Sequence, residues 1–323
     1  MKIPTGNSKG VALILVLLVL GLIVPMTLDL NRASRAQIYE AANLADGLRA
    51  VYIAKSGVHL GEALLGEDDA SVDSLQESWA RAEVLSAQST LLFSEGAFLL
   101  KIEDESGKIP VNHLVEGDEY REEIKDVLMR LLRLPGFQLK EEDIRDLVDA
   151  LKDWIDSDDD LTGFGAENSY YQSLADAYSC RNGPFERLEE LRLVRGVTAE
   201  LFEGTEGRPG LRDCLTVYGE GKININTAPL SVLTALSGEM DGERVRALDE
   251  YRRNTEKDLG RVRWYEEVPG MSGIALPDAI LTTAGSVFRF TSEGRFRDIP
   301  GKVTAVIRRG EGKAMEILDW RES

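Results

Sequence analysis

The sequence contains little cysteine, histidine or positive charge. Of its 323 residues, two are cysteines (Cys180 and Cys214) and two are histidines (His59 and His113). Zinc clusters and Cys/His nucleophilic sites need more of these residues, so both classes of site are disfavoured. The 38 basic residues are outnumbered by 56 acidic ones, which gives a formal net charge of -18. Because this charge repels a phosphate backbone, cations and basic protein surfaces are better candidate ligands than nucleic acid.

The apolar content excludes a disordered acidic tail. Hydrophobic residues make up 43% of the chain, and 323 residues are enough for a sizeable core and more than one domain. We therefore expect a folded protein in which acidic side chains are neutralised by partners or ions.

Charge is absent from the segment 11–28, VALILVLLVLGLIVPMTL. Eighteen uncharged, mostly apolar residues are near the lower limit for a helix that spans a bilayer. Lys2 and Lys9 precede the segment and Asp29 follows it, which favours a cytoplasmic N-terminus and a translocated remainder, in a bacterium in the periplasm. A cleaved secretory signal is disfavoured because residues 28–30 offer no small-residue cleavage site.

A helical pattern continues beyond the apolar segment. Apolar residues form a stripe at Ile38, Ala41, Ala45, Leu48, Val51 and Leu60. A continuous helix over 11–65 would be about 80 Å long at about 1.5 Å per residue. Pro25 is expected to kink it within the membrane segment.

The N-terminus resembles the class III signal of type IV pilins and secretion-system pseudopilins. A short basic leader, residues 1–10, ends in Gly10 and is followed by the apolar segment. The resemblance implies that a membrane peptidase cleaves between Gly10 and Val11. Most members have a glutamate five residues after the cleavage site, where this chain has Leu15. The minor pseudopilin K of type II secretion is the member that characteristically lacks that glutamate.

An internal repeat organises the middle of the chain. GKIPVNHL (107–114) is echoed by GKININTA (221–228), and EELRLVRG (189–196) by EEVPG (266–270). This indicates two tandem helical units. Helical patterns follow at 122–136 and 141–155 in the first unit, and after Thr227, as N-cap, and at 243–254 in the second.

Strand patterns flank these helical units at 98–102 and in the last forty residues. The predicted fold class is α+β: a long N-terminal helix and a pilin-like α/β platform with a large inserted helical domain. The expected divisions are the leader 1–10, the helix 11–65, the platform 66–110 and 277–323, and the helical units 111–219 and 220–276.

An acidic loop, DSDDDLTGFGAE, follows the second helix of the first unit. Asp156, Asp158 and Asp160 occupy places one, three and five, Thr162 place seven and Glu167 place twelve, which is the spacing of a calcium loop. Magnesium is disfavoured because it rarely uses an all-protein cage. The sixth place is Leu161 instead of glycine, so an EF-hand fold is not expected. The alternative is a solvated, flexible acidic loop.

Longer segments extend the resemblance. DWIDSDDD, GAENSYY, DESGKIPVN and GKININTAPLSVLTAL are similar to segments of the general secretion pathway protein K family. The resemblance implies a pseudopilin sheet with a SAM-like helical insertion that binds calcium. It also implies a non-enzymatic protein of the inner membrane, anchored by one helix and methylated after prepilin cleavage. Its expected partners are other minor pseudopilins, the major pseudopilin, the prepilin peptidase and exported proteins.

Cys180 and Cys214 are expected to lie in the translocated part, where a disulfide can form and persist. Two buried free thiols are the alternative.

His59 and His113 are not near a serine or cysteine in a nucleophile context, so catalysis is not expected. LVRG and VPG are also similar to helix-hairpin-helix modules that bind DNA, but their surroundings are acidic.

The function expected from these patterns is that of a minor pseudopilin at the tip of the type II secretion pseudopilus. Such a protein would initiate filament assembly and support export across the outer membrane. The alternative is a freestanding, membrane-tethered periplasmic calcium-binding adaptor.

Overall fold

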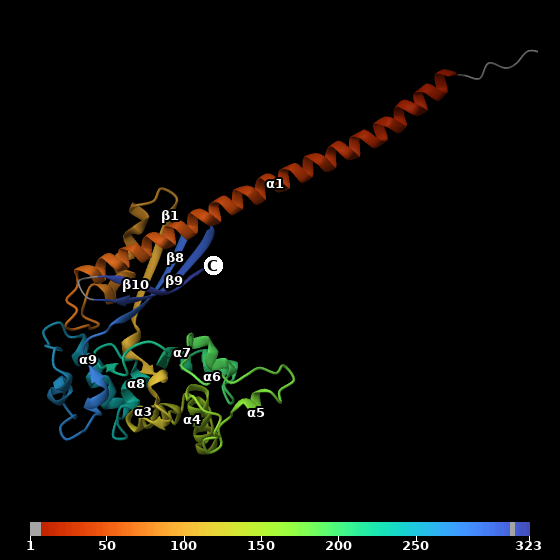
Figure 1. Ribbon diagram of the computed structural model, residues 1–323. Helices are drawn as coiled ribbons and strands as arrows, with labels where there is room; N and C mark the ends of the chain where they lie inside the picture. Colours follow the sequence, from red (N-terminus) through yellow and green to blue (C-terminus); the bar gives the residue numbers. More distant parts are fainter. Residues whose placement is uncertain (1–7, 311–313) are drawn as a thin grey trace, which may run out of the picture.

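The long N-terminal helix dominates the outline of the molecule. The computed structural model describes residues 8–310 and 314–323, so most of the predicted leader lies outside the described residues. Helix α1 (Ser8–Glu67) is continuous and contains Pro25. Figure 1 shows a gentle curve without a sharp bend, so the predicted kink is wrong. A proline removes one backbone hydrogen bond, and here the helix continues on both sides of it.

The N-terminal part of α1 is the one segment of the described residues long and apolar enough to cross a membrane. Its large apolar side chains from Val11 to Leu28 are exposed. A polypeptide exposes such a continuous apolar surface only where lipid or partner helices cover it.

The second half of α1 packs on a four-stranded antiparallel sheet, the platform. Its strands are β1 (Gly96–Asp104), β8 (Val287–Phe296), β9 (Ile299–Arg309) and β10 (Met315–Glu322), in that spatial order. The core between helix and sheet includes Ala54, Val58, Leu65, Phe288, Phe290, Val303 and Ala305.

Glycines allow α1 and the sheet to approach closely. A Cβ on Gly294 of β8 would lie 2.3 Å from the carbonyl oxygen of Ala50 and 2.5 Å from the amide nitrogen of Ala54. On the helix side, a Cβ on Gly57 would lie 2.2 Å from Oγ of Ser292. Backbone lies almost against backbone at this contact, which only glycine permits.

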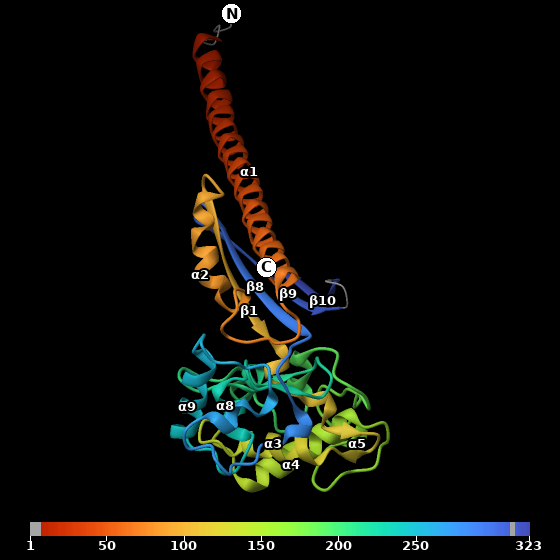
Figure 2. The same ribbon diagram turned by 90° about the vertical axis from the view of Figure 1, so that its left-hand side faces the viewer.

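Two serines protect the outer edge of β1. They come from α2 (Ala82–Ser86) and the 3₁₀ helix η2 (Ala87–Leu91), which follow η1 (Trp79–Arg81) and lie beside β1 in Figure 2. Ser89 Oγ donates to the carbonyl of Phe98 at 2.8 Å and accepts from its amide at 2.9 Å. Ser86 Oγ accepts from the amide of Leu100 at 2.9 Å. These contacts satisfy backbone groups that an edge strand otherwise leaves unpaired.

Between β1 and β8 the chain forms a separate, mostly helical body, the head, residues 105–286. Its first part contains η3 (Glu105–Gly107), β2 (Ile109–Pro110), η4 (Val111–His113), β3 (Val115–Glu116), β4 (Glu119–Tyr120), α3 (Glu122–Leu132), α4 (Glu141–Ile155), α5 (Asn168–Tyr171), η5 (Leu188–Leu193), α6 (Ala199–Glu203), α7 (Leu211–Cys214) and β5 (Leu215–Thr216). The second contains β6 (Ile223–Asn224), α8 (Leu230–Ala235), α9 (Gly242–Arg253), η6 (Val262–Glu267), η7 (Asp278–Ile280) and β7 (Leu281–Thr282). Figure 2 shows the head at the end of the platform opposite to the N-terminus.

In each half of the head, a short parallel strand pair joins the beginning of that half to its end. Strand β2 pairs with β5, and β6 pairs with β7. Asn112 and Asn226 occupy the same place in the two sequence repeats and have matching roles. The side-chain amide of Asn112 donates to the carbonyls of Phe185 and Val217, and that of Asn226 donates to the carbonyls of Leu259 and Thr283. Residues 105–110 and 277–286, which the sequence analysis assigned to the platform, therefore form the base of the head.

A buried ionic group connects the head to the platform. Glu105, at the start of the head, accepts from Lys108 and from Arg289 of β8, both at 2.7 Å. Its other oxygen accepts from Thr216 Oγ1 at 2.7 Å. Although burial opposes its charge, the neighbouring Lys108 and Arg289 lower the pKa of Glu105 to about 2. The carboxylate therefore stays ionised and fixes the first residues of the head to the sheet.

The predicted fold class is confirmed. Helix α1, the platform strands and the inserted helical body are all present. One local expectation is wrong: Thr227 does not cap the following helix, because its hydroxyl donates to Oδ2 of Asp104 at 2.7 Å. Pro229 is the N-cap residue instead.

Candidate metal centre

The candidate metal centre lies where α4 ends and the acidic loop begins. Helix α4 forms because Ile144, Leu147, Val148 and Leu151 repeat at helical spacing and are buried in the head. Its last turn also buries Trp154, whose ring packs edge-on against Tyr171 with centroids 5.2 Å apart and stacks on Phe185 at 6.1 Å. The aromatic contacts join both ends of the loop to the core.

The loop itself is anchored to carboxylates of α4. The amide of Thr162 donates to Oδ1 of Asp153 at 3.1 Å, and the amide of Phe164 donates to Oδ2 of Asp149 at 3.1 Å. A Cβ on Gly165 would lie 2.1 Å from Oδ2 of Asp153, so this approach requires glycine. These bonds favour an ordered loop over a solvated, flexible one.

Three of the predicted metal ligands come together. One carboxylate oxygen from each of Asp156, Asp158 and Glu167 lies within 4.8 Å of the others. Asp156 and Glu167 are buried, at 1% and 3% exposure. Such a group of hard oxygen atoms is a donor set typical of calcium.

The other two predicted ligands do not join this group. Asp160 is exposed, and its amide donates to Oδ1 of Asp158 at 2.8 Å. The carbonyl of Thr162, expected to bind the ion, accepts from the amide of Gly165 at 2.8 Å, and its hydroxyl lies 3.0 Å from Nζ of Lys152. Thr162 instead contacts residues of α4, because its amide donates to Asp153 and its hydroxyl lies beside Lys152. With Leu161 in place of the sixth-place glycine, an EF-hand turn is not expected here.

Two residues that the spacing did not indicate lie beside the group. Asp153 precedes Asp156 by one turn of α4. Asn182 comes from a later segment and donates to the carbonyl of Asp158, with a left-handed backbone of φ 47°. The helical spacing of Asp153 was a signal that could have been used, whereas nothing in the sequence points to Asn182.

Buried oxygen atoms without a hydrogen-bond partner test whether a cation fits. Among the described residues, those at this site are Asp153 Oδ2, Asp156 Oδ1, Glu167 Oε1, Glu167 Oε2 and Asn182 Oδ1. A buried polar atom without a partner is strongly unfavourable, and native proteins rarely retain several together. These atoms are all acceptors, so a hard cation would satisfy them where a further hydrogen-bond acceptor could not.

The electrostatics of the site point in the same direction. Burial, together with the neighbouring charges of Asp153 and Asp156, raises the pKa of Glu167 to about 8. Burial likewise raises the pKa of Asp153 to about 6. Nζ of Lys152 lies 2.7 Å from Oδ2 of Asp156 and balances the charge of this one carboxylate. Oδ1 of Asp156 still has no hydrogen-bond partner among the described residues.

The predicted Cys180–Cys214 disulfide is wrong, because both cysteines are buried free thiols. Sγ of Cys180 lies 3.5 Å from the carbonyl oxygen of Asp153, beside the acidic loop. Cys214 ends α7 in a different part of the head. Burial raises the pKa of both thiols, to about 11 and about 12 respectively, so neither is a reactive thiolate at neutral pH.

Comparison with known proteins gives a consistent result. Residues 107–206 match the family model described as type II secretion system (T2SS), protein K. Type II secretion system protein K of Pseudomonas aeruginosa is 32% identical over 71% of this chain and 68% of the relative, and that of Aeromonas hydrophila is 26% identical over 97% and 96%.

A solved structure shares the fold. The complex of GspK, GspI and GspJ from the type 2 secretion system of enterotoxigenic Escherichia coli contains a chain that matches with a TM-score of 0.66 and 17% identity, over 90% of this chain and 99% of that one. The similarity to the Pseudomonas relative, 32% identical over more than two thirds of both chains, establishes that this chain belongs to the type II secretion system protein K family.

Proposed function

We propose that the chain is a minor pseudopilin at the tip of the type II secretion pseudopilus, where it initiates filament assembly and supports export of folded proteins across the outer membrane. The observation that carries the proposal is the position of the head, beyond the platform and opposite to the N-terminus of α1 (Figure 2). A subunit stacked above this chain would have to accommodate the head, whereas a tip subunit has no neighbour above it.

The N-terminal helix supports the same proposal. Leu15 is apolar and exposed at the position where most pseudopilins are expected to have a glutamate that pairs with the subunit ahead. A first subunit has no subunit ahead and needs no such charge. In this proposal α1 spans the inner membrane once, with a cytoplasmic N-terminus and a periplasmic C-terminal part.

The proposed partners follow from the exposed surface of α1. Beyond the membrane segment, Ile38, Tyr39, Leu44, Leu48 and Tyr52 remain exposed. We propose that helices of other minor pseudopilins cover them, and the solved relative is itself part of a complex with GspI and GspJ. The major pseudopilin, the prepilin peptidase and exported proteins are further proposed partners.

Co-purification from membranes tests this assembly. We expect Leu48→Glu to reduce recovery of the other minor pseudopilins at least tenfold, because a charge would be buried between helices. Asn43→Glu, at an exposed polar position of the same helix, is the matched control. Equal recovery with both variants would contradict the helix interface, and absence of pseudopilin partners from the unmodified protein would favour the freestanding adaptor.

We also propose that the acidic loop holds a structural calcium ion. The residues that would hold it are Asp156, Asp158 and Glu167, with Asp153 and Asn182, since their unpaired oxygens fit a hard cation. The ion would neutralise the buried carboxylates and hold the loop against α4.

Thermal unfolding tests the calcium site. At a concentration 100-fold above its Kd, calcium would stabilise the folded state by about 2.7 kcal/mol, a rise in Tm of roughly 5–10 °C for a body of this size. Glu167→Gln should abolish most of this rise, whereas Asp176→Asn, at an exposed position of the head, should retain it. The same Tm in calcium and in EDTA would exclude the site.

A further inference from the structure

A second acidic group lies far along the chain from the acidic loop, in the segment that follows α1. The segment 68–77 passes between the platform and the head. The amide of Asp73 donates to the carbonyl of Thr283 at 2.8 Å, and Nδ2 of Asn224 donates to the carbonyl of Asp73 at 3.0 Å. The amide of Gly285 donates to Oδ2 of Asp73 at 2.7 Å. Asp73 is therefore fixed to the segment that connects the head to β8.

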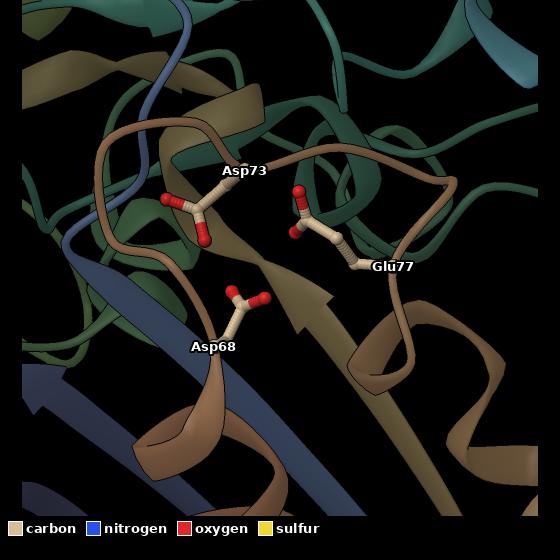
Figure 3. A group of neighbouring side chains, drawn as sticks. All are labelled: Asp68, Asp73 and Glu77. Carbon is tan, nitrogen blue, oxygen red and sulfur yellow. The ribbon is translucent and has the colours of Figure 1, made fainter. Parts of the chain in front are cut away.

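Three carboxylates converge at this junction. Oxygens of Asp68, Asp73 and Glu77 lie within 4.8 Å of one another. Figure 3 shows Asp68 directly after the end of α1, Asp73 on the following loop and Glu77 before the next helical turn, with their carboxylates turned toward a common centre. The group contains oxygen donors from three positions of one short segment.

One of these carboxylates has an oxygen with no partner. Asp73 is completely buried, and its Oδ1 has no hydrogen-bond partner among the described residues. A buried carboxylate oxygen left without a donor is strongly unfavourable. The unpaired Oδ1 of Asp73 is a separate observation from the clustering of the three carboxylates. It indicates that a positively charged ligand, such as a metal ion, binds beside this oxygen.

The charges of the group are also incompletely balanced. Nη1 of Arg309 lies 3.3 Å from Oδ2 of Asp68, and Nη2 of Arg309 pairs with Asp73, whereas Glu77 has no ion pair among the described residues. Burial raises the pKa of Asp73 to about 7, although Arg309 opposes this, and burial also raises the pKa values of Asp68 and Glu77. When all three carboxyls are ionised, the one guanidinium balances only one of them, and a divalent cation would balance the other two.

We propose that Asp68, Asp73 and Glu77 form a second divalent-cation site, at the junction of α1, the platform and the head. All donors are carboxylate oxygens and no cysteine or histidine belongs to the group, which selects a hard cation of the calcium type over zinc. The bound ion connects the end of α1 to the strand that leaves the head. This site uses none of the residues of the acidic loop, and it stands whether or not that loop binds calcium.

Terbium luminescence tests this site in the full chain in detergent micelles. Tb³⁺ replaces calcium at oxygen sites and emits when a nearby tryptophan is excited. The indole of Trp79 donates to Oε2 of Glu77, so Tb³⁺ at the junction should be sensitised by Trp79. In a Glu167→Gln background, which removes the acidic loop site, we expect saturable emission that Trp79→Phe reduces at least fivefold and that excess calcium displaces.

Ligand variants complete the test. Glu77→Gln should weaken Tb³⁺ and Ca²⁺ binding at least tenfold, whereas Asp69→Asn, an exposed neighbour outside the group, should leave it unchanged. Glu77 does not pair with Arg309, so this variant is expected to keep the folded structure, and equal melting of variant and parent in EDTA checks this. Unchanged calcium binding in a folded Glu77→Gln protein, or emission insensitive to Trp79→Phe, would overturn the proposal.

Discussion

At the scale of single residues, Glu167 makes the stability of the head depend on pH. Its folded-state pKa of about 8 lies above the value of about 4.3 expected in an unfolded chain. Protonation therefore stabilises the folded state, fully below about pH 4 and progressively less as pH rises toward 8. Asp153, with a pKa of about 6, and Asp73, with a pKa of about 7, act in the same direction.

We predict that the Tm of the protein in EDTA falls as pH rises from 5 to 8, since the unfolded state binds fewer protons than the folded state in this range. Calcium should reverse most of this fall, because a cation binds the ionised carboxylates and releases their protons. Differential scanning fluorimetry across this range measures both effects.

The Glu167→Gln variant separates this residue from the other titrating groups. In EDTA its Tm should fall less steeply with pH than that of the unmodified protein, with the remaining slope contributed by other carboxyls whose pKa burial raises, among them Asp153 and Asp73. Parallel curves for the two proteins would mean that Glu167 does not titrate in this range.

The candidate site was predictable only in part, for reasons visible at single residues. Spacing identified Asp156, Asp158 and Glu167, because they lie in one short loop. It could not identify Asn182, whose side chain reaches the loop through the tertiary fold. It also included Thr162, whose carbonyl is used in a turn with Gly165. The sequence of the loop therefore shows which oxygen donors are available, but not which of them the backbone turns toward the candidate metal centre.

At the scale of elements, the contact between α1 and β8 depends on glycine. We predict that Gly294→Ala destabilises the platform by roughly 1–3 kcal/mol, because the added methyl group would press on backbone atoms of Ala50 and Ala54 that have no rotamer to change. Chemical denaturation measures the loss. Gly238→Ala is the matched control, since no heavy atom lies within 4 Å of its added Cβ, and its effect should stay within about 0.5 kcal/mol. Equal stability of the two variants would contradict the close packing.

Helices and strands were predicted well where apolar residues repeat at regular spacing. They were predicted less well where a residue distant in sequence forms the deciding contact. Helix α4 (Glu141–Ile155) matches its predicted range, because its buried residues repeat at helical spacing. The role of Thr227 was wrong because Asp104, far away in sequence, competes for its hydroxyl. The pairing of β1 with β8 could not be derived, since no local pattern records which strand lies beside which.

At the scale of the whole molecule, the proposed role in filament assembly requires cleavage of the leader after Gly10. We predict that intact-mass analysis of the protein from a host with its native peptidase finds a chain that starts at Val11. Gly10→Val should block this cleavage, while Gly21→Val serves as control, because an added Cβ has open space at both positions. A chain of full length from the native host would contradict processing by the pseudopilin pathway.

The strands on either side of the head have a consequence for the whole molecule. Asp104 of β1 and Phe288 of β8 face each other directly in an antiparallel ladder, a distance that a turn of a few residues can close. A short hairpin could therefore replace the head without changing the strand order of the sheet or its contact with α1. The head is an insertion at one β-hairpin of the platform, so the size and surface chemistry of the head can change while α1 and the platform keep their structure.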